Sequence, residues 1–140
     1  MKRLFLAVSF LFLFSGIGFA QSTDTVQGYL SAEGTTCAVT KCVTLSIPAG
    51  SGSVGIQISG TFTADIEIEA TIDGSNYLAV SAFPLTAGAS VTQVTAAGAW
   101  RLNAAGLKKV RVRCSDYTSG LASVTIVSSP ASYVGTPAES

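Results

Sequence analysis

Residues 61–80, TFTADIEIEATIDGSNYLAV, decide the fold of this 140-residue chain. Between Asp65 and Ile72, charged or polar residues alternate with isoleucine and alanine, and this period of two is typical of a strand with one buried face. Residues 73–76, DGSN, are turn formers, and 77–80 are largely apolar again. The stretch therefore predicts a β-hairpin. The residues expected on its buried face are Ile66, Ile68, Ala70 and Ile72.

The same alternation constrains the hairpin loop. A loop with an even number of residues would place Leu78 and Val80 on the charged face, whereas an odd number places them on the isoleucine face. Because register is fixed where one face of a sheet is buried, we predict an odd-length or bulged loop.

The rest of the chain contains further short alternating runs, separated by turn residues. Strands are expected at 26–30, 43–47, 54–59, 98–103, 107–114 and 121–128, with a weaker one at 90–95. No stretch beyond Ala20 has helical periodicity. About eight short strands predict an all-β, antiparallel, jelly-roll-like sandwich over residues 21–129. Gly60, between two of these strands, suggests a bend or bulge.

The segment from Met1 to Ala20 has the composition of a secretory signal peptide. Two basic residues precede an apolar run at 4–14, and the small residues that end at Ala20 suit cleavage at that point. The apolar run is short for a membrane-spanning helix, and an uncleaved anchor is the alternative. We expect a secreted or periplasmic protein, with residues 130–140 as a C-terminal tail and no membrane span after cleavage.

The composition argues against several classes of function. Charged residues make up 11% of the chain, and histidine is absent. Once the segment up to Ala20 is removed, the chain keeps six basic and eight acidic side chains, a net charge of −2, which does not favour nucleic-acid binding. Histidine is the usual general base and a common metal ligand. We therefore expect a protein that is not an enzyme and uses no cofactor or metal.

Three cysteines allow one disulfide in an oxidising compartment. Cys37 and Cys42 close the shortest loop, which makes a bond between them the simplest pairing. Cys114 shares its parity with Val110 and Val112, so we expect it in the core as a free thiol that behaves as a small hydrophobe.

Two rows of charge lie on predicted strands. The acidic row is Asp65, Glu67 and Glu69, and the basic row is Lys109, Arg111 and Arg113. Alternate strand positions are roughly 7 Å apart, a separation that does not exclude glycoside hydrolysis, although a solvated strand face is the simpler interpretation. We hypothesise that the two strands are neighbours in one sheet and that the rows pair. In separate sheets, the basic row would instead be free to meet an anionic partner.

A possible ligand site is assembled from turn and loop residues. The candidate ligand-binding residues are Asp73, Asn76, Asp116 and Tyr117. Clustered oxygens suit calcium, but Asp, Gly, Ser and Asn are also what a simple turn contains. Tyr117, in an expected loop at 115–120, is the best-placed aromatic residue to stack on a sugar. Trp100 is instead expected in the core.

Two segments resemble a small β-sandwich module of bacteriophage virion proteins, which occurs in tail-fibre, baseplate and head-decoration proteins. The segments are 60–80 and 98–126. The shared features are a Gly-Thr before the acidic strand, an Asp-Gly turn followed by an aromatic residue, a Trp-Arg pair and the run GLKKVRV. The architecture is also similar to that of jelly-roll carbohydrate-binding modules.

The resemblance implies a non-enzymatic structural or interaction module that assembles with itself or binds a cell-surface or glycan partner. The alternative that it implies is a carbohydrate-binding, lectin-like module. The export signal favours a secreted bacterial protein that uses the same module, whereas a phage-encoded chain would belong to the virion.

Overall fold

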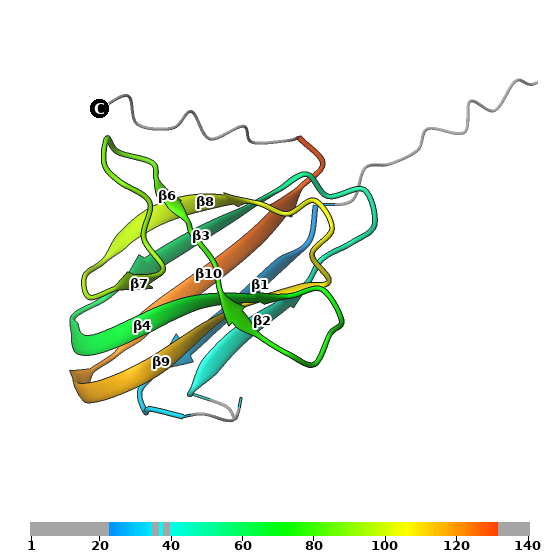
Figure 1. Ribbon diagram of the computed structural model, residues 1–140. Coiled ribbons are helices and arrows are strands. Elements are labelled where there is room, and N and C mark those ends of the chain that lie inside the picture. The colour runs from blue at the N-terminus through cyan, green and yellow to red at the C-terminus, as the bar shows by residue number, and fades with distance from the viewer. Residues whose placement is uncertain (1–22, 35–36, 38–39, 132–140) are drawn as a thin grey trace, which may run out of the picture.

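The computed structural model describes residues 23–34, 37 and 40–131. In these residues the chain forms ten strands in two antiparallel sheets, which pack face to face (Figure 1). The predicted all-β sandwich is confirmed, with ten strands rather than about eight. The described part contains no helix that is long and apolar enough to cross a bilayer. The expected signal peptide and most of the expected tail lie outside the described residues.

Each sheet mixes segments that are far apart in the sequence. The first sheet has the order β1 (Thr25–Leu30), β10 (Ala122–Ser129), β3 (Ser53–Ser59), β8 (Gly98–Asn103) and β6 (Phe83–Pro84). The second has the order β2 (Cys42–Ser46), β9 (Lys109–Gly120), β4 (Phe62–Thr71) and β5 (Leu78–Ala79), with β7 (Gln93–Val94) also paired to β4. The long strands β4 and β9 are therefore direct neighbours.

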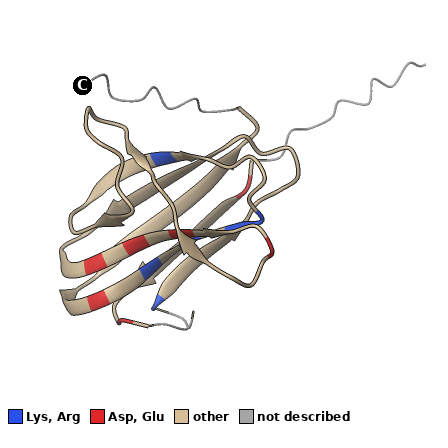
Figure 2. Cartoon of the chain, in the orientation of Figure 1, with Lys and Arg blue, Asp and Glu red and all other residues tan. Residues whose placement is uncertain are grey.

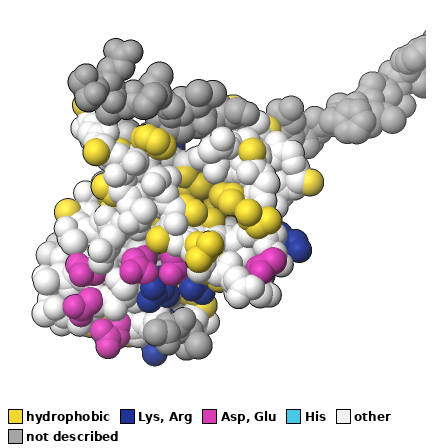
Figure 3. All heavy atoms as spheres, viewed as in Figure 1, with side chains coloured by type: hydrophobic (Ala, Val, Ile, Leu, Met, Phe, Trp, Pro, Cys, Tyr) yellow, Lys and Arg dark blue, Asp and Glu magenta, His cyan; other side chains and the backbone are white. Residues whose placement is uncertain are grey.

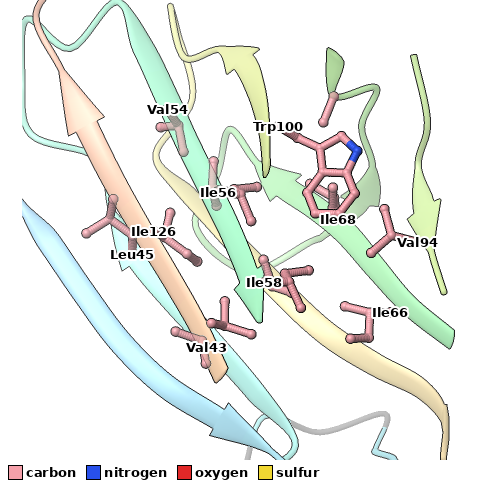
Figure 4. Close-up of a cluster of buried hydrophobic side chains, with 14 of the residues drawn as sticks. Val43, Leu45, Val54, Ile56, Ile58, Ile66, Ile68, Val94, Trp100 and Ile126 are labelled. Atoms are coloured by element: carbon pink, nitrogen blue, oxygen red, sulfur yellow. The ribbon is translucent and has the colours of Figure 1, made fainter. Parts of the chain in front are cut away.

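The hydrophobic core lies between the two sheets, where the inward side chains of both interdigitate (Figure 4). Ile66 and Ile68 of β4 are fully buried, as the alternation predicts. Trp100 is also buried, and Cys114 is a free, buried cysteine, so both of these predictions are confirmed. Burial raises the pKa of the Cys114 thiol, which keeps this side chain neutral in the core.

The alternation fails at the end of β4. Ile72, which we expected in the core, is 75% exposed, because β4 ends at Thr71 and a turn begins there. Thr71, expected on the solvated face, is buried. Its hydroxyl donates to Asp73 Oδ1 (2.8 Å) and accepts from the amide of Gly74 (2.9 Å), so Thr71 serves the turn.

The hairpin loop has an odd length, as predicted. Ala70 lies opposite Leu78, so the seven residues 71–77 connect the paired positions. Val80 packs against the core, in agreement with the expectation. Leu78 does not: it shares a face with Ala70 but is 74% exposed, because β5 is a short strand at the edge of its sheet.

Two glycine corners carry the chain between the sheets. Gly60 follows β3 with φ 105°, and Gly120 ends β9 with φ 92°. A Cβ on Gly120 would lie 2.2 Å from the carbonyl oxygen of Thr61, which accepts a hydrogen bond from the amide of Leu121 (3.0 Å). The two crossings therefore pack directly against each other, and the bend expected at Gly60 is confirmed.

Candidate functional site

The acidic and basic rows face each other on the outer side of the second sheet. β4 and β9 are antiparallel, with Glu67 opposite Arg113 and Glu69 opposite Arg111. Figure 2 shows the acidic and basic positions on these adjacent strands. The hypothesis that the rows pair within one sheet is therefore confirmed for these four residues, which we call the ion-pair ladder.

Each arginine of the ladder binds more than one group. The guanidinium of Arg111 pairs with the Glu69 carboxylate and lies over the ring of Tyr77, 3.8 Å from its centroid. Arg113 pairs with Glu67 and also donates from Nη2 to Glu69 Oε1 (3.2 Å). Glu69 thus holds both arginines, and Tyr77 covers one of them through a cation–π contact.

Glu69 is buried although the alternation places it on the solvated face, and it is 7% exposed. Burial acts to raise the pKa of this carboxyl, but the hydrogen bonds and charges of Arg111 and Arg113 outweigh it and lower the pKa below its ordinary value. The Glu69 hydrogen bond raises the pKa of Arg113 in turn. The ladder is therefore ionised and internally neutralised, which leaves little net charge for an external partner.

The disulfide segment closes one side of the ladder. Cys37 and Cys42 are bonded, with their Cα atoms 5.2 Å apart, as predicted. Arg113 Nη1 donates to the carbonyl of Gly34 (3.2 Å), and the Gly34 amide donates to the Cys114 carbonyl (3.1 Å). Arg111 Nη1 lies 3.9 Å from Cys37 Sγ, so Gly34 and Cys37 each contact an arginine of the ladder.

The remaining members of the two rows, Asp65 and Lys109, are not opposite a residue of the other row. Asp65 lies opposite Asp116, next to two register shifts in the β4–β9 pairing. These two aspartates line an open hollow together with Thr95 and Thr118. At the other end Lys109 lies opposite Thr71, and its ammonium group is 3.5 Å from the carbonyl oxygen of Gly74.

The candidate ligand residues are not brought together. Asp73 and Asn76 belong to the turn after β4, whereas Asp116 and Tyr117 lie toward the far end of β9. About six strand positions separate the two pairs along β4, which amounts to roughly 20 Å. The strand pairing therefore does not place all four residues in a single site.

The Asp73 carboxylate is used by its own turn. It accepts hydrogen bonds from the backbone amides of Ser75 (2.7 Å) and Asn76 (2.8 Å) and from the Thr71 hydroxyl. The backbone donors at Asn76 and Ser75 hold the pKa of Asp73 far below its ordinary value. The simple turn is thus the better interpretation, and within 23–34, 37 and 40–131 no three Cys, Asp or Glu side chains group around a metal position.

Tyr117 lies in a strand and not in the expected loop. β9 continues to Gly120, where it still pairs with Phe62, because register shifts let β4 and β9 stay paired along their length. The half-buried Tyr117 ring packs against the core, and its hydroxyl donates to the Gly120 carbonyl (2.8 Å). The ring is therefore a poor platform for stacking on a sugar.

One surface feature was missed because parity assigned Ile72, Leu78 and Val80 to the core. A shallow hollow beside Asp73 and Asn76 is lined by the buried Ala70 and by four larger apolar residues: Ile72, Leu78, Val80 and Leu107. We call them the apolar patch. In Figure 3 hydrophobic side chains gather just above the charges of the ladder. The clue in the sequence was the position of Ile72, directly before the turn.

Comparisons with known proteins identify solved structures with a similar fold but no protein family. No protein-family model matches this chain, and no curated protein matches its sequence. The solved structure of the SPBc2 prophage-derived protein YomS matches with a TM-score of 0.59 and 18% identity, over 78% of this chain and 96% of YomS. The PBSX exported protein XepA matches with a TM-score of 0.60 and 14% identity, over 91% of this chain. That match covers 46% of XepA, so this chain spans about half of that protein. At these identities the likeness shows a shared fold: the chain has the β-sandwich of a prophage-derived protein and of an exported one.

Proposed function

We propose that this chain is an exported, non-enzymatic interaction module of the phage accessory type, which assembles with itself or binds a partner at a surface. The observation that carries the proposal is the fold likeness to YomS, which extends over 96% of that prophage-derived protein. Because this one sandwich accounts for nearly all of YomS, we infer that a protein with this fold acts through the surfaces of the sandwich.

The state of the carboxylates supports a non-enzymatic function. Glu67 and Glu69 are neutralised by arginines, and Asp73 is held by its turn. Asp65 and Asp116 face each other, but in an open hollow where Asp116 is exposed. A carboxyl that serves as a catalytic acid is usually placed in an apolar pocket that keeps it protonated.

Three observations support export. The segment from Met1 to Ala20 has the composition of a cleavable signal peptide. The structural neighbour XepA is named as an exported protein. A disulfide between Cys37 and Cys42 is also a bond that persists in oxidising compartments.

An epitope-tagged chain, followed in its host before and after phage induction, tests the proposal. We expect a mature protein that begins at Gln21, appears in the periplasm or medium, and sediments with phage particles or cell envelopes. A version without residues 2–20 is the control and should stay inside the cell. A tagged chain that is never exported, or that is exported but neither sediments with either fraction nor associates with itself, would contradict the proposal.

Carbohydrate binding stays a prediction as the second candidate. The hollow beside Asp65 and Asp116 supports it most, because carboxylates accept hydrogen bonds from sugar hydroxyls. A glycan array with the purified mature protein measures it. Sugar-specific binding that is lost in Asp116→Asn and in Asp65→Asn would support this candidate, and an array without specific signals would refute it.

A further inference from the structure

We propose that the apolar patch is a homotypic interface, at which two copies of this chain meet about a two-fold axis beside β5. The inference rests on the proposed function, since it names the surface through which the module assembles with itself. Three features carry it: the exposure of the patch, the open edge of β5 and the charges at the border.

The patch exposes large apolar side chains next to one another. Ile72 and Leu78 are 75% and 74% exposed, and both line the same hollow. Val80 and Leu107 form its floor, where they pack partly against the core. Single exposed apolar residues are ordinary on protein surfaces, but a contiguous group rimmed by polar residues usually marks an interaction site.

The edge of β5 is open to a further strand. The amide of Val80 donates to the carbonyl of Ile68 (3.0 Å), and backbone hydrogen bonds alternate in direction along a strand. The N–H and C=O of Ala79 therefore point away from β4, and Ala79 is exposed. Edge strands are commonly protected by short length, lysine, proline or a bulge. β5 consists of leucine and alanine, so its two-residue length is the protection it has, and an added strand would gain few backbone hydrogen bonds there.

The border charges suit a second copy better than a strongly charged partner. The exposed Lys108 lies beside the turn of Asp73, since a Cβ on Gly74 would be 3.3 Å from the Lys108 side chain. The border of the patch thus carries one acid, Asp73, and two bases, Lys108 and Lys109, and the ammonium group of Lys109 is 3.5 Å from the carbonyl oxygen of Gly74. The neighbouring ladder is neutralised internally. About a two-fold axis, a lysine of one copy can face Asp73 of the other, and this charge complementarity suits an isologous interface.

The size of the patch sets the expected strength. A standard interface buries about 800 Å² on each partner, and four side chains with a two-residue strand cover less than that. We therefore expect a transient dimer, with a dissociation constant on the order of 100 μM.

Sedimentation velocity of the mature chain, from about 10 μM to about 1 mM, measures the association. Leu78→Lys and Ile72→Lys each place a charge in the patch, and both side chains are exposed enough for the monomer to keep its fold. We expect each change to raise the dissociation constant at least roughly tenfold, since one buried leucine contributes a decade or more in affinity. Leu121→Lys, an exposed leucine at the far end of β9, is the matched control and should leave the dimer unchanged.

Three results would overturn the interface. The first is a monomer at every concentration, and the second is a dimer that both patch variants leave intact. The third is a chain ending at Ala131 that dimerises far more strongly than the full chain, because residues 132–140 would then be the occupant of the patch. Unchanged circular dichroism and melting temperature in the lysine variants exclude a folding defect as the cause. A monomer that still sediments with particles or envelopes removes this interface but not the proposed function. A chain that dimerises through the patch but is never exported keeps the interface and removes the proposed function.

Discussion

Replacing Glu69 by glutamine tests how strongly the ion-pair ladder stabilises the second sheet. Glutamine keeps the size of the side chain and one carbonyl oxygen but loses the charge. Arg111 and Arg113, whose side chains are each only 14% exposed, would then share Glu67 as their remaining acidic neighbour in the ladder. The change therefore leaves one positive charge uncompensated on a mostly covered face.

The expected loss is about 2–3 kcal/mol in the free energy of unfolding. Breaking a buried ion pair by removing one partner costs about 3–5 kcal/mol. Here three arginine N–H groups lose a charged acceptor: Nε of Arg111, and Nε and Nη2 of Arg113. Water still reaches the ladder from its open side and screens part of the interaction, which puts the loss below the value for full burial.

Urea denaturation at pH 7, followed by the fluorescence of the buried Trp100, measures this loss as a lower midpoint with an unchanged slope. Glu67→Gln is the matched control, because Glu67 is 31% exposed and binds Arg113 alone, so its loss should stay below about 1 kcal/mol. Equal losses in the two variants would refute the argument that Glu69 is the centre of the ladder.

The same variant has a predicted pH dependence. The pKa of Glu69 is lowered on folding, so its stabilising contribution is complete above the unfolded value of about 4.3 and is lost as pH falls through the folded value. The difference in stability between the natural chain and Glu69→Gln should therefore shrink below about pH 4. A difference that grows as the solution is acidified would contradict the sign of the shift.

Other substitutions test the remaining supports of the fold. Gly120→Ala should lower the free energy of unfolding by about 2–4 kcal/mol, because φ is positive there and the new Cβ would lie 2.2 Å from a backbone oxygen. Gly50 also has a positive φ but open space around it, so Gly50→Ala should cost only about 1 kcal/mol, and the melting temperatures of the two variants test the difference. Replacing Cys37 and Cys42 by serine should lower the free energy of unfolding by about 2 kcal/mol, the value expected for a loop of this length. If the serine variant is also less stable than the natural chain in its reduced form, the loss does not come from the disulfide. Ile68→Ala removes a fully buried side chain and should lower the free energy of unfolding in urea by about 2–5 kcal/mol. A loss below about 2 kcal/mol would argue against a core position for Ile68.

The sequence alone determined the local features of the fold. The period of two in residues 65–72 predicted β4 and its buried isoleucines, and the odd loop length followed from the same parity. The charged rows predicted their own partner strand, because equal spacing and opposite sign favour a shared register. Each of these inferences depends on neighbouring residues or on a simple match between two strands.

The exposure of individual side chains depended on the tertiary structure. Parity says which face of a strand a residue is on, but not which elements lie above that face. Glu69 is buried because two arginines from β9 bind it, and Tyr77 covers one of them, Arg111. Ile72 and Leu78 are exposed because β4 ends and β5 is an edge, although both keep the parity of the core.

The positions of the candidate ligand residues also depended on contacts between distant parts of the chain. Asp73 and Asp116 are both acidic residues near expected turns, and the sequence offered no reason to separate them. The antiparallel pairing of β4 and β9 places them near opposite ends of the ladder. The sequence therefore determined the strands, their faces and their charges. The strand order, the register shifts and the ends of the sheets decided which charges meet and which apolar side chains face water, because these come from contacts between residues distant in the chain.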